Sequence, residues 1–409
     1  MKTNLFLVLL VCASLGFLTF FSSCNNSGKN SKETDLIEDT IPKINFPKDS
    51  TQDQIGNLLS GIDISGYSQI SISDSSFWNK YKLEIDSAWK KLSQERLSKM
   101  DNWSKIEISP KINDTTLLFY PFSGPDFLNA YHLFPNANDY TLIAMEKLGT
   151  IPDLKQATEK DIKAYLNSVN NGLRDIYKRS YFITGNMEQD LRKNQVNGVL
   201  PLLYVFLERT GHKIYEFGYY QLQDDGVSFL PIDKPTNSLK VAECIKFKVL
   251  KEGDTKLKEV TYFYADISDD GFVKNPILLQ YLKSMRECNT FIKSASYLSH
   301  YETFTNIRNT TLEKSKAVLQ DDTGVPFRYF TKNFDYFLYG TYEKPIDDFK
   351  TGAKYLFQKD LEEKYQTENP KALDFSLGYH WRSGIQNWVL YVRKVVEVKN
   401  EADSIAPKN

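Results

Sequence analysis

The sequence predicts an α/β (or α+β) fold, in which a mixed sheet with a βαβ unit and added antiparallel hairpins is flanked by several helices. Three observations predict this fold class. Short apolar runs alternate with segments whose apolar residues recur at helical spacing. The first two apolar runs are separated by more than about a dozen residues, the length that a parallel crossover requires. Later strand-like segments are joined by short polar turns, which is typical of antiparallel hairpins.

The N-terminal residues have the pattern of a bacterial targeting segment. Lys2 supplies a positive charge, and residues 5–21 form an apolar run. Two serines and Cys24 follow directly, which resembles the lipobox, where the cysteine thiol receives a lipid before cleavage. We therefore predict a lipoprotein signal peptide over residues 1–23 and lipidation of Cys24 with acyl chains such as palmitate.

Two alternatives remain for this segment. Phe21 departs from the lipobox pattern, which prefers Leu or another aliphatic residue there, so simple secretion stays open. A retained anchor helix is the second alternative, because a spanning helix needs about 20 residues. No second run of about 18 apolar residues occurs later, so we expect the remainder of the chain to be soluble.

Three further regions follow the predicted signal. Residues 24–55 are rich in Asn, Ser, Lys, Asp and Gly and predict a flexible tether. We expect a single globular domain over residues 56–400 and a disordered tail over residues 401–409. The first helix of the domain begins after a cap at Asp74 or Ser75, because Trp and other apolar residues recur from there at helical spacing.

A βαβ unit is predicted next. Residues 117–120 and 141–145 are continuous apolar runs of the kind found in strands buried on both faces. Pro125 suits the first turn of the helix between them. The unit therefore places two parallel strands side by side.

The alternation of helix and strand continues through the middle of the chain. Thr158 and Asp161 form a capping box that begins a helix. The segment between Pro201 and Gly211 is apolar nearly all round and predicts a buried helix. A strand is expected over residues 213–222.

A hairpin is predicted from residues 239–250 and 257–267, which flank a polar turn at 252–254. The remaining predicted elements are helices over 275–299 and 303–320, a turn over 320–326, a strand over 334–342, a helix over 350–366, and strands over 374–380 and 387–398.

Composition gives no sign of a nucleic-acid partner. Lys and Arg total 51 and Asp and Glu total 52, so the net charge recruits neither nucleic acid nor anionic lipid. Aromatic residues make up 14% of the chain, which is enough for an aromatic core with rings left over. We expect most rings to pack in the core, and a sugar-binding surface is the alternative.

Two cysteines remain after processing. Cys12 leaves with the signal and Cys24 takes the lipid, so Cys244 and Cys288 are left. An oxidising compartment favours a disulfide between them. That disulfide would close a loop of about 45 residues and stabilise the folded state by roughly 4 kcal/mol. Cys244, however, shares the predicted solvent side of its strand with Lys246, whereas Cys288 lies on the apolar stripe of a predicted helix. We predict free thiols, with the disulfide as the alternative.

Metal-binding patterns are incomplete in this sequence. The histidines have no helical metal-ligand spacing; they are His132, His212, His300 and His380. Asp266, Ser268, Asp270 and Gly271 match the opening of a calcium loop, but Ile277 stands where a bidentate Glu is needed. We expect a plain turn there, and no metal site.

Ser123 follows a predicted buried strand, as the serine of a nucleophile elbow does. That motif is G-x-S-x-G, and here Pro121 stands two places before the serine. A serine hydrolase that uses Ser123, Asp126 and one histidine is therefore only an alternative. No phosphate-binding loop, dinucleotide-binding fingerprint, kinase motif or CxxC occurs in the sequence.

The loop over residues 121–126 is the candidate ligand site. Open α/β sheets bind ligands beyond the carboxyl ends of their strands, and this loop leaves such an end. Ser123 could cap the following helix, while Gly124 lets the backbone approach a ligand closely. Asp126 lies in the first turn of that helix. The alternative is that Ser123 and Asp126 only cap the helix and nothing binds there.

Three segments carry a family resemblance. Residues 120–135 (YPFSGPDFLNAYHLFP), 319–326 (LQDDTGVP) and 377–394 (LGYHWRSGIQNWVLYVRK) resemble segments of a group of lipoproteins from Gram-negative bacteria. The resemblance covers most of the chain after Cys24. It implies residence in the cell envelope and carries no established activity, so no catalytic residue follows from it.

These observations favour an envelope-anchored lipoprotein that binds a small molecule, a glycan or a protein partner, without a cofactor. The membrane contact is the N-terminal lipid, and we expect the outer membrane, with the body in the periplasm or on the cell surface. A hydrolase of envelope or imported polymers is the alternative, and a structural subunit of an envelope complex is a third. An enzymatic role is the less favoured expectation.

Overall fold

The structure is a computed structural model that describes residues 51–63, 72–113, 116–181, 197–330, 332–346, 356–381 and 385–395. These residues belong to one compact unit, Lys43–Asn409. The predicted signal peptide, Cys24, most of the predicted tether and the tail over 401–409 lie outside the described residues.

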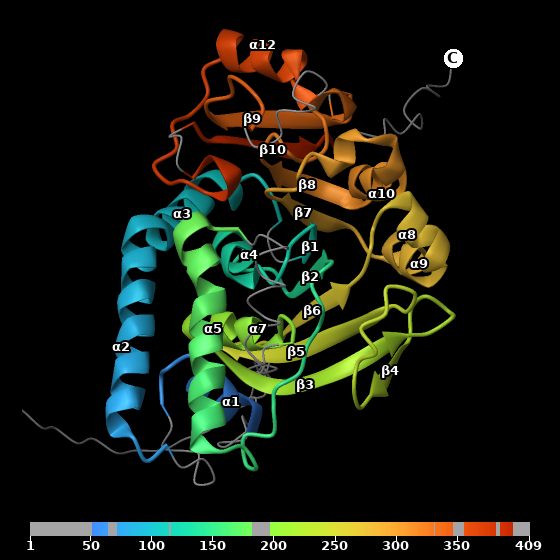
Figure 1. The fold of residues 1–409 in the computed structure, drawn as a ribbon. Coiled ribbons are helices and arrows are strands. Elements are labelled where there is room, and N and C mark those ends of the chain that lie inside the picture. Colours follow the sequence, from blue (N-terminus) through green and yellow to red (C-terminus); the bar gives the residue numbers. More distant parts are fainter. Residues whose placement is uncertain are drawn as a thin grey trace, which may run out of the picture. The chain divides into compact units, whose positions relative to one another are not determined.

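A ten-stranded mixed sheet organises the unit, in the order β4-β3-β5-β6-β2-β1-β7-β8-β10-β9 (Figure 1). The predicted fold class is thereby confirmed. The strands are β1 (Leu117–Pro121), β2 (Asp139–Ala144), β3 (His212–Leu222), β4 (Phe229–Ile232), β5 (Glu243–Lys251), β6 (Lys258–Tyr264), β7 (Cys288–Ile292), β8 (Ser315–Gln320), β9 (Phe334–Gly340) and β10 (Asn387–Arg393).

The five central strands, β6, β2, β1, β7 and β8, are parallel, and antiparallel strands extend the sheet on both sides. β1, helix α4 (Phe127–Leu133) and β2 form the predicted βαβ unit, with Leu117 opposite Asp139. The predicted hairpin is also confirmed, because β5 and β6 pair in antiparallel orientation. The central position of β1 places the loop after it in the middle of one sheet edge.

Helices cover both faces of the central sheet (Figure 1). One face packs against α1 (Thr51–Leu59), α2 (Ser75–Leu92), α3 (Ser98–Trp103), α4, α5 (Glu159–Arg179) and α7 (Leu200–Arg209). The other face packs against α8 (Asp269–Lys274), α9 (Pro276–Ser284) and α10 (Thr305–Lys314). Successive β1 residues accordingly enter different cores, with Leu118 and Tyr120 in one and Leu117 and Phe119 in the other.

Helix ends follow the predicted caps. The Asp74 carboxylate accepts the N–H of Phe77 at the start of α2, and Thr158 and Asp161 form the predicted capping box of α5. α7 carries Pro201 in its first turn.

α1 begins at Thr51, so a helix starts inside the segment predicted as a tether. α12 (Lys359–Thr367) follows β9 near the end of the unit. The described residues contain no helix with the length and apolar character needed to span a bilayer.

Three predicted elements are wrong. The helix predicted over 275–299 ends at Ser284, and the following residues form β7, a central strand. The helix predicted over 303–320 is α10 followed by β8. Both strands are buried on two faces, and an apolar run without alternation does not separate a strand from a helix. Residues 374–380, predicted as a strand, instead contain the 3₁₀ turn Gly378–His380.

The predicted solvent position of Cys244 is also wrong. Cys244 and Cys288 are both fully buried and both free, and they belong to the same apolar cluster. Tyr281 of α9 packs into this cluster, so a helix covers the part of the sheet that the lysine-rich pattern had placed in solvent. Three strands separate β5 from β7, which places the two strands about 19 Å apart across the sheet and the two thiols at least that far apart. This distance forbids a bridge between them.

Candidate functional site

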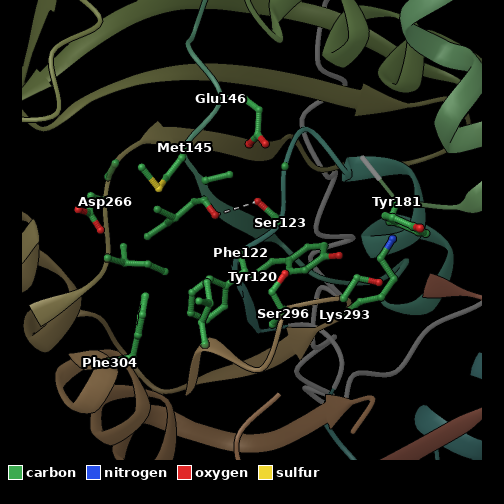
Figure 2. A pocket seen from close by; sticks show the side chains of 18 of the residues that line it. Tyr120, Phe122, Ser123, Met145, Glu146, Tyr181, Asp266, Lys293, Ser296 and Phe304 are labelled. Carbon is green, nitrogen blue, oxygen red and sulfur yellow. Dashed lines mark hydrogen bonds between the residues drawn. The ribbon is translucent and has the colours of Figure 1, made fainter. Parts of the chain in front are cut away.

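A pocket of about 410 Å³ lies at the carboxyl ends of four parallel strands, β1, β2, β6 and β7 (Figure 2). The connection after β1 leads to β2 on one side, whereas β7 pairs with the other side of β1. The loops after β1 and β7 therefore leave toward opposite faces of the sheet. A crevice forms between such loops, and open α/β sheets bind their ligands there.

The loop after β1 forms one wall of the pocket. Ser123 and Gly124 line it, together with Phe122. Phe122 and Gly124 have φ values of 60° and 56°, a left-handed conformation that glycine adopts easily and phenylalanine rarely does. The Ser123 hydroxyl donates to the Ile143 carbonyl at 3.3 Å, so it is tied to β2.

Ser123 does not cap the helix after this loop, which corrects one of its two predicted roles. Asp126 is the cap of α4, and its Oδ1 accepts the N–H of Asn129 at 3.2 Å. A carboxylate in this position satisfies helix donors directly, which leaves the shorter serine side chain to bond elsewhere. Asp126 is 1% exposed and lies behind the pocket wall, not in it.

Asp126 also holds a buried lysine that lines the pocket. The Lys293 Nζ lies 2.5 Å from Asp126 Oδ2, and both side chains are almost fully buried. The Tyr120 hydroxyl donates to the same carboxylate at 3.0 Å, and Lys293 donates to the Ser180 carbonyl. Burial lowers the pKa of Lys293, against the opposing effect of Asp126. The pocket thus has a charged pair in one wall whose two charges neutralise each other.

The loop after β7 forms the facing wall and has an unusual backbone. Ser294, Ser296 and Tyr297 have φ values of 54°, 52° and 56°. Each such residue costs about 1–3 kcal/mol and persists only where surrounding contacts enforce it. Non-glycine residues in this conformation cluster at binding and catalytic sites, and here they occur in both loops that flank the crevice.

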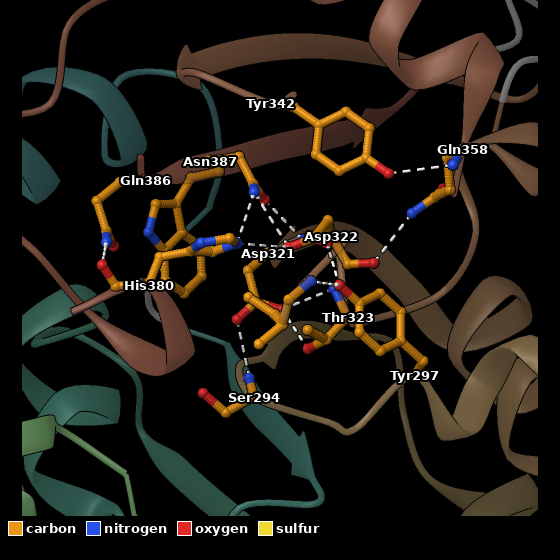
Figure 3. A network of polar contacts seen from close by, with 12 residues as sticks. Ser294, Tyr297, Asp321, Asp322, Thr323, Tyr342, Gln358, His380, Gln386 and Asn387 are labelled. Carbon is orange, nitrogen blue, oxygen red and sulfur yellow. Dashed lines mark hydrogen bonds and ion pairs between the residues drawn. The ribbon is translucent and has the colours of Figure 1, made fainter. Parts of the chain in front are cut away.

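A turn after β8 enforces this backbone (Figure 3). The Ser294 N–H donates to Asp321 Oδ2 at 2.9 Å, and the Ala295 N–H donates to Thr323 Oγ1 at 2.8 Å. The Tyr297 hydroxyl donates to Asp322 Oδ2 at 2.5 Å. Three consecutive residues of the turn therefore hold the strained loop through separate hydrogen bonds.

The C-terminal strand region anchors the turn in its place. Asp322 Oδ1 accepts the side-chain amide of Asn387 at 3.0 Å and lies 3.3 Å from His380 Nε2. Burial, followed by the neighbouring charge of Asp322, raises the pKa of Asp321 to about 6. The segment predicted as a simple turn is thus a buried polar network that supports the pocket wall.

The rest of the lining combines carboxylates with aromatic rings. Glu146 follows β2 and is 6% exposed, and Asp266 follows β6 and accepts the N–H of Ser268 at 2.9 Å. Two ring pairs contribute to the lining; they are Phe122 with Phe304, with centroids 5.9 Å apart, and Tyr181 with Tyr379, with centroids 4.8 Å apart. Both acceptor groups and apolar surfaces therefore face the same cavity.

Histidine is missing from the lining among the described residues. His132 lies 2.6 Å from Asp101, His212 contacts Thr210, His300 lies half-buried beside Tyr297 and His380 contacts Asp322. Ser123 therefore has no base of the predicted type in the pocket. In the described part of the chain, no group of three or more His, Cys, Asp or Glu side chains could hold a metal ion, and Ser268 of the calcium-like segment caps α8.

Sequence reasoning missed most of the polar and aromatic groups that line this pocket, among them Glu146, Tyr181, Lys293 and Tyr379. Lys293 was hidden because its segment was predicted as helix. Asp266 was noticed only as part of an incomplete calcium pattern. What they share is their position: Glu146, Asp266 and Lys293 each lie within a few residues of the end of a parallel strand. This position could have indicated the site only if the strand order had been known.

Comparisons with known proteins leave the chain without an assigned family. No family model, curated protein or solved structure gave a significant match. The lipoprotein resemblance therefore stays a prediction from the sequence.

Proposed function

We propose that the chain is a small-molecule-binding protein of the bacterial cell envelope, attached to the membrane through a lipid on Cys24. The observation that supports the binding role is the pocket of about 410 Å³ between the loops after β1 and β7, both of which contain residues with a strained backbone. Its volume falls in the range of about 300–1,000 Å³ that small-molecule sites occupy. The targeting pattern before Cys24 supports the location.

A hydrolase is the weaker candidate. Ser123 lines the pocket, but its hydroxyl is bonded to a strand carbonyl and its neighbours in the described lining include no histidine. Nucleophilic serines require an adjacent base that accepts their proton. Binding without turnover needs none of these groups and agrees with the lining as it stands.

A ligand screen on the full-length chain in detergent tests the binding role. We expect at least one compound from a library of sugars, amino acids, nucleotides and short peptides to raise the melting temperature. Met145 lines the pocket and is 53% exposed, so Met145→Trp should obstruct the pocket without disturbing the core.

The matched control is Val273→Trp on α8, where the side chain is 81% exposed and does not line the pocket. The expected result is that Met145→Trp weakens the stabilisation by the ligand at least tenfold in apparent affinity, while Val273→Trp leaves it unchanged. Binding that survives Met145→Trp, or a complete lack of binding across the library, would contradict the proposed role.

A further inference from the structure

The chemistry of the pocket narrows the class of ligand. Its charged lining groups are Lys293, Glu146 and Asp266 among the described residues. Lys293 is already paired with Asp126 at 2.5 Å, so its charge is cancelled inside the protein. The pocket therefore presents no uncompensated cation that would select a phosphate or a carboxylate ligand.

Donors and acceptors occur together in the lining. Carboxylates accept hydrogen bonds, whereas the Lys293 ammonium donates them and the hydroxyls of serine and tyrosine do both. An ammonium ligand could use only the acceptors, and an anion could use only the donors. A ligand rich in hydroxyl groups uses both kinds of partner, because each hydroxyl donates and accepts.

One polar atom of the wall lacks a partner within the described protein. The Ser294 hydroxyl is buried and makes no hydrogen bond to any described group. A buried hydroxyl without a partner costs about 1–3 kcal/mol, which a hydrogen bond to a ligand would offset. The left-handed backbone of the same residue adds to the cost of keeping this wall in place.

Aromatic rings supply the apolar part of the surface. Phe122 and Phe304 lie on one part of the lining (Figure 2). Tyr181 and Tyr379 form a second ring pair. The Tyr379 hydroxyl lies 2.7 Å from the Ser296 hydroxyl, so this ring is fixed in orientation. Flat rings edged by hydroxyls match a pyranose ring, whose faces carry C–H groups and whose rim carries hydroxyls.

From these features we propose that the pocket binds a neutral saccharide of one or two rings. The inference rests on the proposed binding function and adds the class of ligand. Glu146 and Asp266 accept hydrogen bonds from the sugar hydroxyls, the Ser294 hydroxyl and Lys293 donate to them, and the aromatic rings pack on a ring face. The bound sugar carries no charge, and no covalent bond is formed or broken.

Calorimetry on the full-length chain in a non-glycosidic detergent tests this class. The probes are glucose, galactose, N-acetylglucosamine, maltose and cellobiose, compared with glucose 6-phosphate, glucosamine and choline. We expect binding of at least one neutral sugar, and at least tenfold weaker binding of its charged counterparts. Phe304→Ala removes one ring of the lining and should weaken the sugar at least tenfold.

Tyr301→Ala is the matched control, because Tyr301 lies in the same segment, is 47% exposed and does not line the pocket. This variant should bind the sugar as the wild type does. Tighter binding of choline, glucosamine or a phosphate sugar that also depends on Phe304 would overturn the saccharide assignment and leave the binding function intact. If Phe304→Ala binds the sugar as well as the wild type does, the assignment of the sugar to this pocket is overturned. If none of the probes binds, the saccharide class is overturned.

Discussion

At the scale of single residues, Asp126 connects the fold to the pocket. It caps α4 and at the same time pairs with Lys293, which lies in the loop after β7, far along the chain. A buried ion pair adds little net stability when it is intact, because both ions lose their hydration. Removal of one partner is costly, because the remaining charge is then buried alone.

We therefore predict that Lys293→Met lowers the free energy of unfolding by about 3–5 kcal/mol. Urea denaturation followed by circular dichroism measures this loss. The control is Lys248→Met in the surface pair of Lys248 with Glu216, whose side chains are 46% and 43% exposed. That change should cost less than about 1 kcal/mol. Equal losses in the two variants would contradict the role assigned to the buried pair.

The network behind the pocket wall predicts a pH dependence. The folded-state pKa of Asp321 is raised to about 6, whereas an aspartate in an unfolded chain titrates near 3.9. The folded state therefore favours protonated Asp321, and the stability that this proton contributes is complete below about pH 4 and lost as the pH rises through about 6. Asp322 carries the neighbouring charge that adds to the effect.

Asp321→Asn tests this dependence because the amide does not titrate. We expect the stability of the wild type relative to the variant to fall by on the order of 2–3 kcal/mol between pH 4 and pH 7. Denaturant midpoints at half-unit pH intervals give the difference. The variant keeps one acceptor oxygen and therefore loses the hydrogen bond from either Ser294 or Thr323, which shifts the difference at every pH by a constant amount. A difference without any pH dependence would refute the prediction.

The thiols give a third prediction at this scale. Burial raises the pKa of Cys288 to about 11 and raises that of Cys244 further, so neither thiolate forms near neutral pH in the folded protein. We expect a maleimide reagent to leave both residues unlabelled in the native state and to label both after denaturation without reductant. Peptide mass spectrometry identifies the sites. Labelling that appears only after reduction would show a disulfide instead.

At the scale of elements, two chain segments pack closely at the carboxyl end of β2. Gly149 and Gly198 pack backbone against backbone, and a Cβ at Gly198 would overlap the backbone of Gly149. The N–H groups of Val199 and Leu200 donate to the carbonyls of Lys147 and Leu148. The start of α7 is thereby attached to the segment that follows β2.

Gly198→Ala should for this reason destabilise the fold by about 1–3 kcal/mol. Thermal unfolding of the variant measures the effect. Gly172→Ala in α5 is the control, because the nearest atom there is a flexible Leu202 methyl at 3.3 Å and alanine favours the helix. That variant should retain its stability within about 1 kcal/mol. A tolerant Gly198→Ala would mean that the two segments can separate.

The predictability of elements followed their patterning. Helices with caps and one apolar face were predicted close to their observed starts: α5 follows the predicted cap Thr158, and α2 follows Asp74, one of the two caps considered. β7 and β8 were predicted as the ends of helices, because strands buried on both faces show no alternation and their flanking helices run directly into them. The same failure concealed the loop that carries Lys293 and the left-handed residues.

At the scale of the whole molecule, the anchor is the property open to direct measurement. We predict that the mature protein begins at Cys24 and carries a lipid there. Intact-mass analysis of protein extracted from membranes should show cleavage before Cys24 and the added acyl mass. Cys24→Ala should abolish the modification and leave the chain unprocessed or released from the membrane. An unmodified N-terminus at another residue would contradict the anchor.

Local patterns in the amino-acid sequence were enough to predict the fold class, the βαβ unit, the capped helices and the position of the loop over residues 121–126 at the end of a buried strand. These features depend on the spacing of apolar residues, on turn residues and on helix caps, all of which can be read within a short stretch of sequence. Three features became visible only in the folded chain: Lys293 pairs with Asp126, Asp321 and Thr323 hold the strained loop, and the pocket opens between β1 and β7. Those contacts join residues far apart in the chain, and the strand order that brings them together results from packing on both faces of the sheet.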